Sequence, residues 1–177
     1  MIVRQAAPND AAAIARIHVD SWRTTYRGII PEAYLASLSY EEGEKRWAAR
    51  LSDSAGKICV YVAENEAGQI VGFVCGGPDR DNDPVYKGEL YAIYILQTAQ
   101  GQGLGRRLTL ALAEGLLQIG IDSMILWVFA GNPARRFYEA LGGQLVKSNQ
   151  FEVSGATIDE VAYAWPDIRT LLKEQKA

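Results

Sequence analysis

The chain has 177 residues, of which 49% are hydrophobic and 22% are charged, a composition typical of a compact domain with a substantial apolar core. Its formal net charge of −3 argues against the basic surface that nucleic-acid-binding proteins need. No apolar run approaches the length of a transmembrane helix, and the N-terminus lacks the basic flank and long apolar run of a signal peptide. We therefore expect a cytoplasmic protein with no nucleic-acid or membrane partner.

The first part of the chain predicts a strand followed by helices. Residues 2–6 suit a short strand, and Pro8 suits the first turn of a helix, where its missing N–H costs nothing. One face of that helix carries side chains at helical spacing: Ile14, Ile17, His18, Ser21, Trp22 and Thr25. Gly28 and Pro31 break this pattern, and a short helix is predicted over 32–38.

A further helix has a clear start signal. Ser39 with Glu42 three residues later forms a capping box, in which each side chain satisfies a free backbone N–H of the other's residue. This pattern predicts a helix from Ser39 to about Asp53.

The middle of the chain predicts three strands. Residues 57–64 and 69–76 are β-rich, and the turn-like sequence 65–68 joins them. The polar stretch 78–84 is expected to be a loop, and a third strand is predicted over 87–96. Alternation along this strand places four side chains on one face: Glu89, Tyr91, Ile93 and Ile95.

The two cysteines, Cys59 and Cys75, fall inside these apolar strands. Neither has a histidine or a second cysteine at metal-ligand spacing, so we expect no metal site. Two buried free thiols in a reducing compartment are the expected state.

Helices and strands alternate in the second half. An apolar stripe predicts a helix over 104–119, followed by a fully buried strand over 123–129. The next helix begins with Asn132 as its cap and Pro133 in its first turn, and Gly142 ends it.

Two last strands are predicted over 144–152 and 157–165. Pro166 is expected to close a single domain spanning 1–166, and the polar tail 167–177 is expected to fray. The order of elements indicates an α/β sandwich with a mixed sheet.

The segment Gln100–Gly105 is a glycine-rich loop between a predicted strand and a predicted helix. The N-terminus of a helix offers unpaired amides and a partial positive charge, and glycines let the backbone approach a ligand closely. Together these features predict a cradle for a pyrophosphate, to which Arg106 and Arg107 can add charge.

Two common nucleotide-binding loops fit this segment poorly. A P-loop needs Gly-Lys-Ser/Thr, and this chain has Gly105-Arg106-Arg107 instead. A Rossmann turn needs G-x-G-x-x-G and an acidic residue near the end of the next strand. Here the glycines are Gly101, Gly103 and Gly105, and the next strand ends in Val-Phe-Ala-Gly at 128–131.

The loop Gln100-x-x-Gly103-x-Gly105 is similar to the Q/R-x-x-G-x-G/A signature of the GNAT superfamily of N-acetyltransferases. Glu89-Leu-Tyr-Ala-Ile-Tyr-Ile-Leu resembles the strand that precedes it, and the segment from Asn132 to Gly142 resembles N-x-x-A-x-x-F-Y-x-x-x-G. Thr98 departs from the proline of many members, a minor variation, and residues 17–31 resemble a bacterial subgroup. The order of elements matches from residue 2 to 165, and the specific motifs lie within 89–142.

This resemblance implies a mostly antiparallel sheet of about seven strands flanked by about four helices, and acetyl-CoA as co-substrate. The pantetheine arm is expected to pair with the backbone at Ile93 and Ile95, between splayed strands, and the pyrophosphate to lie on the amides of the loop. The implied cofactor-binding residues are Ile93, Tyr94, Ile95, Gln100, Gly101, Gln102, Gly103, Leu104, Gly105, Arg106, Asn132 and Tyr138.

Acetyl transfer to an amine requires three things. The ammonium must lose a proton, because its pKa is near ~10.4; the developing oxyanion needs a donor; and the departing thiolate gains from a proton. Tyr138 resembles the family's general acid by its position in the Phe-Tyr pair. A packed core tyrosine is the alternative.

Glu89 is the candidate general base, acting directly or through a water, because it begins the strand that leads to the cofactor. The alternative is a surface glutamate at the end of a strand.

Asn132 is expected both to cap its helix and to contact the cofactor. His18, Trp22 and Tyr26 are candidates for the acceptor pocket, where the aromatic rings can hold an amine by cation–π contact. Ordinary core packing of these three side chains is the alternative.

Two other functions stay open at this stage. A non-catalytic acyl-CoA sensor can use the same fold, although the presence of both Glu89 and Tyr138 favours an enzyme. A nucleotide-binding domain is disfavoured by the missing lysine and acidic residue. The resemblance suggests a homodimer, and the acceptor is left open among polyamines, amino acids, antibiotics, peptide N-termini and other small amines.

Overall fold

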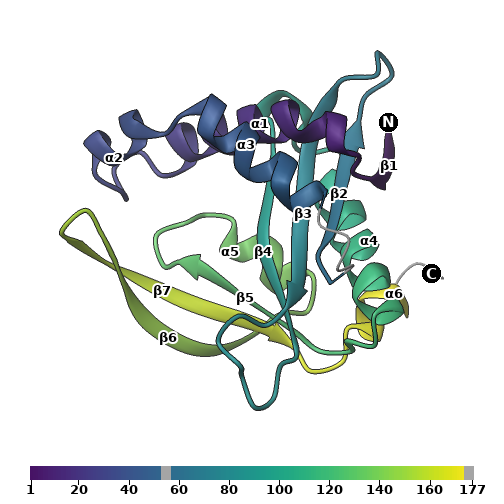
Figure 1. Ribbon diagram of the computed structural model, residues 1–177. Coiled ribbons are helices and arrows are strands. Elements are labelled where there is room, and N and C mark those ends of the chain that lie inside the picture. The colour runs from purple at the N-terminus through teal and green to yellow at the C-terminus, as the bar shows by residue number, and fades with distance from the viewer. Residues whose placement is uncertain (53–56, 174–177) are drawn as a thin grey trace.

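A computed structural model describes residues 1–52 and 57–173 (Figure 1). Its seven strands form one mixed sheet in the order β1-β2-β3-β4-β5-β7-β6. Neighbouring strands are antiparallel except β4 and β5, which are parallel. The strands are β1 (Ile2–Gln5), β2 (Cys59–Glu64), β3 (Ile70–Pro78), β4 (Gly88–Ile95), β5 (Met124–Phe129), β6 (Gln144–Val153) and β7 (Ala156–Trp165).

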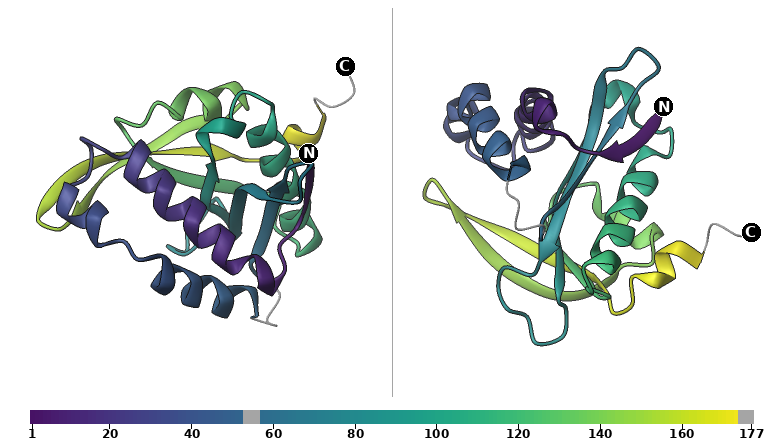
Figure 2. Two further views of the ribbon diagram at one scale, coloured as in Figure 1. Left: turned by 90° about the horizontal axis from the view of Figure 1, so that it is seen from above. Right: turned by 45° about the vertical axis from the view of Figure 1, so that its right-hand side comes forward.

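Six α-helices are described, two more than the approximate number predicted, because α2 and α6 are short additions to the four main ones. They are α1 (Ala11–Thr25), α2 (Glu32–Ser37), α3 (Tyr40–Leu51), α4 (Leu104–Gln118), α5 (Arg135–Ala140) and α6 (Arg169–Lys173). Single 3-10 turns lie at Pro8–Asp10 and Gln97–Ala99. Helices α1 and α3 cover one face of the sheet around β2–β4, and α4 covers the other (Figure 2).

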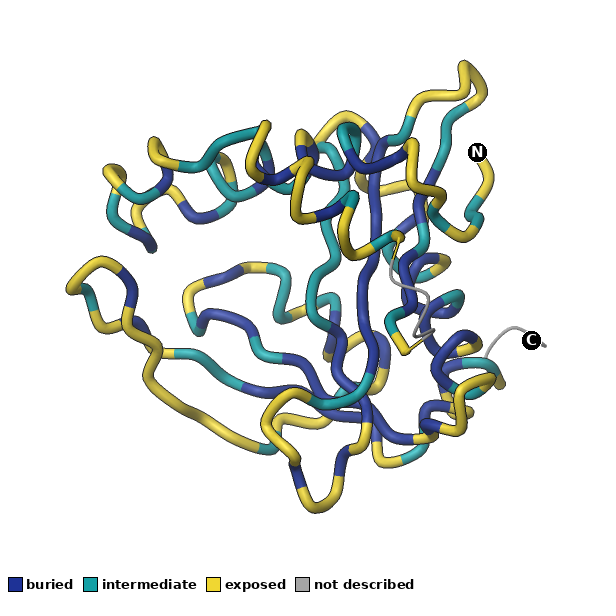
Figure 3. The backbone as a smooth tube through the Cα atoms, viewed as in Figure 1, coloured by how far each residue is buried: buried dark blue, intermediate teal, exposed yellow. Residues whose placement is uncertain are grey.

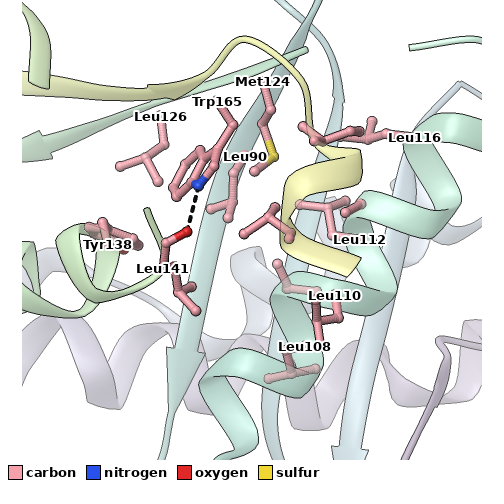
Figure 4. Packing of buried hydrophobic residues seen from close by; sticks show 14 of the residues in the cluster. Leu90, Leu108, Leu110, Leu112, Leu116, Met124, Leu126, Tyr138, Leu141 and Trp165 are labelled. Atoms are coloured by element: carbon pink, nitrogen blue, oxygen red, sulfur yellow. Dashed lines mark hydrogen bonds between the residues drawn. The ribbon is translucent and has the colours of Figure 1, made fainter. Parts of the chain in front are cut away.

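The predicted α4 stripe forms the centre of the larger core. Leu108, Leu112 and Leu116 are fully buried, while the outer turns of the helices are exposed (Figure 3). Trp165 closes this core from β7, and its indole N–H donates to the Leu141 carbonyl oxygen at 2.8 Å (Figure 4). This contact ties the C-terminal end of α5 to the sheet.

The predicted start of α3 is confirmed, because the Ser39 hydroxyl accepts a hydrogen bond from the Glu42 amide. The helix ends at Leu51, and the predicted end at Asp53 lies outside the described residues. Both cysteines are buried free thiols, as predicted. Within the described ranges no helix is long and apolar enough to cross a membrane.

The prediction of a frayed tail after Pro166 is wrong for residues 167–173. Ile168 and Leu171 are buried, and they dock the short α6 against α4. These two apolar residues are three positions apart, so one turn of helix brings both to the same face. The surrounding charged residues mask this pattern in the sequence.

Candidate active site

The sheet opens between β4 and β5. The two strands pair only at Gly88–Met124 and Glu89–Ile125, and then diverge with α5 beyond the opening (Figure 1). From residue 90 onward β4 is hydrogen-bonded to β3 on one side, and its other edge faces the opening. A free strand edge of this kind offers N–H and C=O groups to an extended ligand.

A β-bulge lies at the start of this opening. Gly76 pairs with Leu90 and Cys75 pairs with Ala92, so Tyr91 is an extra residue on β4. The extra residue interrupts the alternation of side chains along the strand.

The prediction that Glu89, Tyr91, Ile93 and Ile95 share one face is therefore wrong. Ile93 and Ile95 pack against the core on the α4 side. Tyr91 packs against the core formed with α1 and α3 on the opposite side. The bulge thus separates Glu89 and Tyr91 from the two residues expected to run along the cofactor.

A cleft of about 140 Å³ fills the opening between the strands. It brings together predicted site residues from four parts of the chain: Tyr26, Ile93, Tyr94, Ile95, Gln100, Asn132 and Tyr138. Of the other predicted catalytic and acceptor residues, Glu89, His18 and Trp22 lie outside its lining. Residues 90–92 of β4 and 126–128 of β5 also line it, from the two strands that were expected to splay apart. Ser21, Thr25 and Ala134 complete the lining, and the sequence did not single these three out as site residues.

Tyr138 projects from α5 into this cleft. The residue is only 7% exposed. Its pKa is raised, first by burial and then by nearby Tyr26, and no hydrogen bond to another described residue offsets these effects. Its phenol is therefore protonated at neutral pH and free to donate to a group placed in the cleft.

Asn132 fixes the turn that leads into α5. Its side-chain oxygen accepts a hydrogen bond from the Ala134 amide at 2.9 Å. The helix itself begins at Arg135, with Ala134 at its cap position and no side-chain cap bond, so the prediction of Asn132 as the helix cap is wrong by two residues. The Asn132 side chain is buried and lines the cleft, and its presence lowers the pKa of Tyr26, against the larger effect of burial.

The glycine-rich loop leads directly into α4. Gly101 and Gly103 both have φ of +73°, which favours glycine, and Gly103 immediately precedes the helix. The first amides of α4 have no partner within the helix, so they and the helix dipole favour an anion at this exposed end. The Gln100 side chain donates to the Ile95 carbonyl oxygen at 3.0 Å and thereby ties the loop to the end of β4.

Gly105 has a different role from the other two glycines. A Cβ atom at this position would lie 3.0 Å from the Phe137 ring, so the missing side chain allows α4 and α5 to pack closely. The spacing between the loop and Tyr138 depends on that close approach.

We expect Gly103→Ala to weaken acetyl-CoA binding roughly five- to thirtyfold, because a Cβ at φ +73° costs about 1–2 kcal/mol and shifts the loop. Gly120→Ala is a matched control. Gly120 has φ +80° at the other end of α4 and, like Gly103, has open space around its Cα. Isothermal titration should show the affinity loss in the first variant only, whereas equal losses would contradict a ligand role for the loop.

Glu89 lies where the strands separate, and its carboxylate is bound by Arg80. The Arg80 Nε donates to Oε2 at 2.9 Å, Nη2 donates to Oε1, and the Arg80 backbone N–H donates to Oε2 at 3.2 Å. The side chain of Glu89 is 2% exposed. The alternative of an exposed surface glutamate is therefore wrong. The sequence does not predict the contact between Arg80 and Glu89. Arg80 lies in the predicted loop 78–84, and it reaches Glu89 only when β3 and β4 have paired.

The aromatic side chains of α1 form a wall next to the cleft. His18 stacks on Tyr94 with ring centroids 5.2 Å apart, and Trp22 packs edge-on against Tyr26 at 4.9 Å. The hydroxyls of Tyr26 and Tyr94 are 3.2 Å apart. Burial, and then Arg46 and Arg50, lower the pKa of His18 to about 4, so this ring is neutral near pH 7.

In the described ranges no group of three or more His, Cys, Asp or Glu residues has a metal-binding arrangement. The site combines a free strand edge, a helix N-terminus and a buried phenol, and the paired carboxylate of Glu89 lies where β4 and β5 separate.

Comparison with known proteins identifies the family to which the chain belongs. The model of the "Acetyltransferase (GNAT) family" matches residues 12–143. The N-acetyltransferase YuaI of Bacillus subtilis is 46% identical over 169 residues, covering 96% of this chain and 95% of that protein. The ribosomal-protein-alanine N-acetyltransferase of Brucella melitensis superposes with a TM-score of 0.73 at 25% identity, covering 93% of this chain and 99% of that one. The Salmonella typhimurium protein yncA, solved with acetyl-CoA, has a TM-score of 0.71 at 23% identity, covering 93% of this chain and 92% of that one. The chain belongs to the GNAT acetyltransferase family.

Proposed function

We propose that the protein transfers the acetyl group of acetyl-CoA to a primary amine by direct attack in a ternary complex. The observation that carries this proposal is Tyr138, a buried phenol that lines the cleft between β4 and β5 and forms no hydrogen bond to another described residue. The Salmonella relative in the same fold is described with acetyl-CoA as its cofactor, which supports the choice of donor.

Two segments of the chain suit two parts of the cofactor, its pyrophosphate and its pantetheine arm. The first amides of α4 and the loop from Gln100 to Gly105 suit the pyrophosphate, with Arg106 on the first turn. The free edge of β4 at Ile93 and Ile95 suits the amides of the pantetheine arm. Bound acetyl-CoA supplies the activated acetyl group.

Two side chains of the protein transfer the protons of the reaction. Glu89 takes a proton from the acceptor ammonium, directly or through a water, and Tyr138 donates its proton to the departing thiolate. The bulge leaves Tyr91 unpaired with β3. A backbone N–H freed in this way can donate a hydrogen bond to the developing oxyanion.

An acetyl-CoA assay that reports free thiol tests the proposal over alkylamines, amino acids, polyamines and peptide N-termini. We expect thiol release that depends on an amine and yields the acetylated amine in equal amount. Tight binding of acetyl-CoA with no thiol release across the panel would contradict the proposal and favour the sensor function.

Two further features belong to this proposal. A cytoplasmic location suits the two buried free thiols. A homodimer is proposed on the basis of the family resemblance, and light scattering of the purified protein measures it.

A further inference from the structure

The pairing of Glu89 with Arg80 is asymmetric. The carboxylate side chain is 2% exposed, whereas the Arg80 side chain is 63% exposed. Glu89 is also the last residue of β4 that pairs with β5, so its carboxylate lies at the vertex of the opening. A cation on an exposed side chain therefore covers a carboxylate that is buried where β4 and β5 separate.

The two partners differ in what they lose by separating. The guanidinium of Arg80 already contacts water, so leaving the pair costs it little. Separation costs Glu89 more, because its carboxylate is buried and loses the counter-ion that offsets its desolvation. A primary ammonium can take the place of Arg80, because it supplies both a positive charge and N–H donors.

The surrounding charges favour a second cation at this point. Asp81 follows Arg80 in the loop between β3 and β4, and Glu160 approaches from β7. Burial raises the pKa of Glu160, the hydrogen bond with Asn149 opposes this increase, and the negative charges of Asp81 and Glu89 add to it. The three carboxylates therefore lie within electrostatic range of one another beside the Arg80 guanidinium.

The Arg80 guanidinium also contacts an aromatic ring. The Arg80 guanidinium lies 4.7 Å from the centroid of the Tyr91 ring. The pKa of Tyr91 is raised to about 12 by burial, then by Glu89 and Cys75, while Arg80 and Arg50 oppose the increase. The neutral ring offers its face to any cation that takes the place of Arg80.

We infer that Arg80 occupies the place of the acceptor, and that the ammonium group of a primary alkylamine exchanges with its guanidinium on the Glu89 carboxylate. The inference rests on the proposed function, in which Glu89 is the base, and it names the acceptor class: alkylamines that carry a positive charge at neutral pH. Weakly basic aromatic amines lack the charge that this exchange requires.

The exchange also gives a balanced sequence of proton transfers. The ammonium gives one proton to Glu89, and the neutral nitrogen forms a bond to the acetyl carbonyl carbon. The C–S bond then breaks, and the thiolate takes a proton from Tyr138, which recovers one from the new N–H₂⁺ group. Glu89 releases its proton to water as Arg80 returns, so one proton is released for each amide formed.

The first test observes Arg80 directly in the full chain. The Nε–H signal of Arg80 is identified in ¹⁵N-edited NMR spectra by its absence from the Arg80→Lys variant. Titration with n-butylammonium chloride should shift this signal, whereas equal concentrations of potassium chloride or tetramethylammonium chloride should not, because neither cation donates N–H bonds. A signal that n-butylammonium leaves unmoved overturns the inference.

The second test measures kinetics with the same amine. Arg80→Met keeps an apolar stem on Tyr91 and removes the competing charge, so kcat/KM for n-butylamine should rise roughly two- to fivefold, the strength of an exposed ion pair. Arg80→Lys retains a competing cation and should give no such rise, and 4-methylaniline should show no gain with either variant.

The outcomes separate this inference from the proposed function. A fall in kcat/KM for Arg80→Met, with unchanged acetyl-CoA affinity and thermal midpoint, overturns the inference because Arg80 then assists the acceptor. An absence of thiol release by the wild-type protein overturns the proposed function alone, since the NMR titration does not depend on turnover.

Discussion

Replacing Tyr138 with phenylalanine should lower kcat by roughly 10²- to 10⁴-fold while leaving the affinity for acetyl-CoA nearly unchanged. The substitution removes one hydroxyl, and that hydroxyl forms no hydrogen bond to another described residue, so the fold loses little. What it removes is the proton for the departing thiolate. Single-turnover measurement of thiol release, together with titration of acetyl-CoA, separates the two quantities.

Tyr163→Phe is the matched control for this loss. Tyr163 lies on β7, outside the cleft lining. Its hydroxyl donates to Glu139 at 2.5 Å and accepts from Arg135 at 3.1 Å, two residues of the helix α5 that also carries Tyr138. This control should lower the thermal midpoint and keep kcat. If Tyr138→Phe behaved in the same way, Tyr138 would be a packed core tyrosine and the acid role would be wrong.

The parts of the site that the sequence predicts are local in the chain. The glycine loop, the turn at Asn132 and the position of Tyr138 each depend on a few consecutive residues and on a helix that starts beside them. Helical periodicity then orients side chains such as Tyr138 without knowledge of distant partners. In the folded chain Gln100, Asn132 and Tyr138 line the same cleft.

The parts that the sequence missed depend on pairing between distant segments. A bulge is a property of two strands, and no pattern within residues 88–95 alone reveals that Tyr91 is the extra residue. The contact of Arg80 with Glu89 likewise requires the register of the hairpin between β3 and β4. Burial and pairing of Glu89 therefore could not be inferred, although the residue itself was singled out.

Replacing Glu89 with glutamine should lower kcat/KM for an alkylamine by roughly 10²- to 10⁴-fold. Glutamine keeps the shape of the side chain and one oxygen that can accept from Arg80, so the loop can remain attached. It cannot take a proton from an ammonium. Steady-state kcat/KM for n-butylamine, measured beside the wild-type protein, gives the size of the loss.

Asp83→Asn distinguishes this catalytic loss from damage to the loop. Asp83 is also a buried carboxylate between β3 and β4, and it is paired with Lys147 of β6. Burial alone would raise its pKa, but the bond from Lys147 and those from the amides of Tyr86 and Val85 outweigh burial and hold the pKa at about 2.

The lowered pKa of Asp83 predicts how stability depends on pH, which makes this variant a specific control. A folded-state pKa below the usual value of 3.8 means that Asp83 stabilises the fold above about pH 4, and that this stability is lost as the pH falls toward 2. Asp83→Asn should therefore reduce stability at neutral pH and weaken its acid dependence, while kcat/KM of the amine reaction stays unchanged. If Glu89→Gln also reduced stability and left kcat/KM intact, Glu89 would serve only to anchor the loop, and the base would have to be sought among the groups that line the cleft.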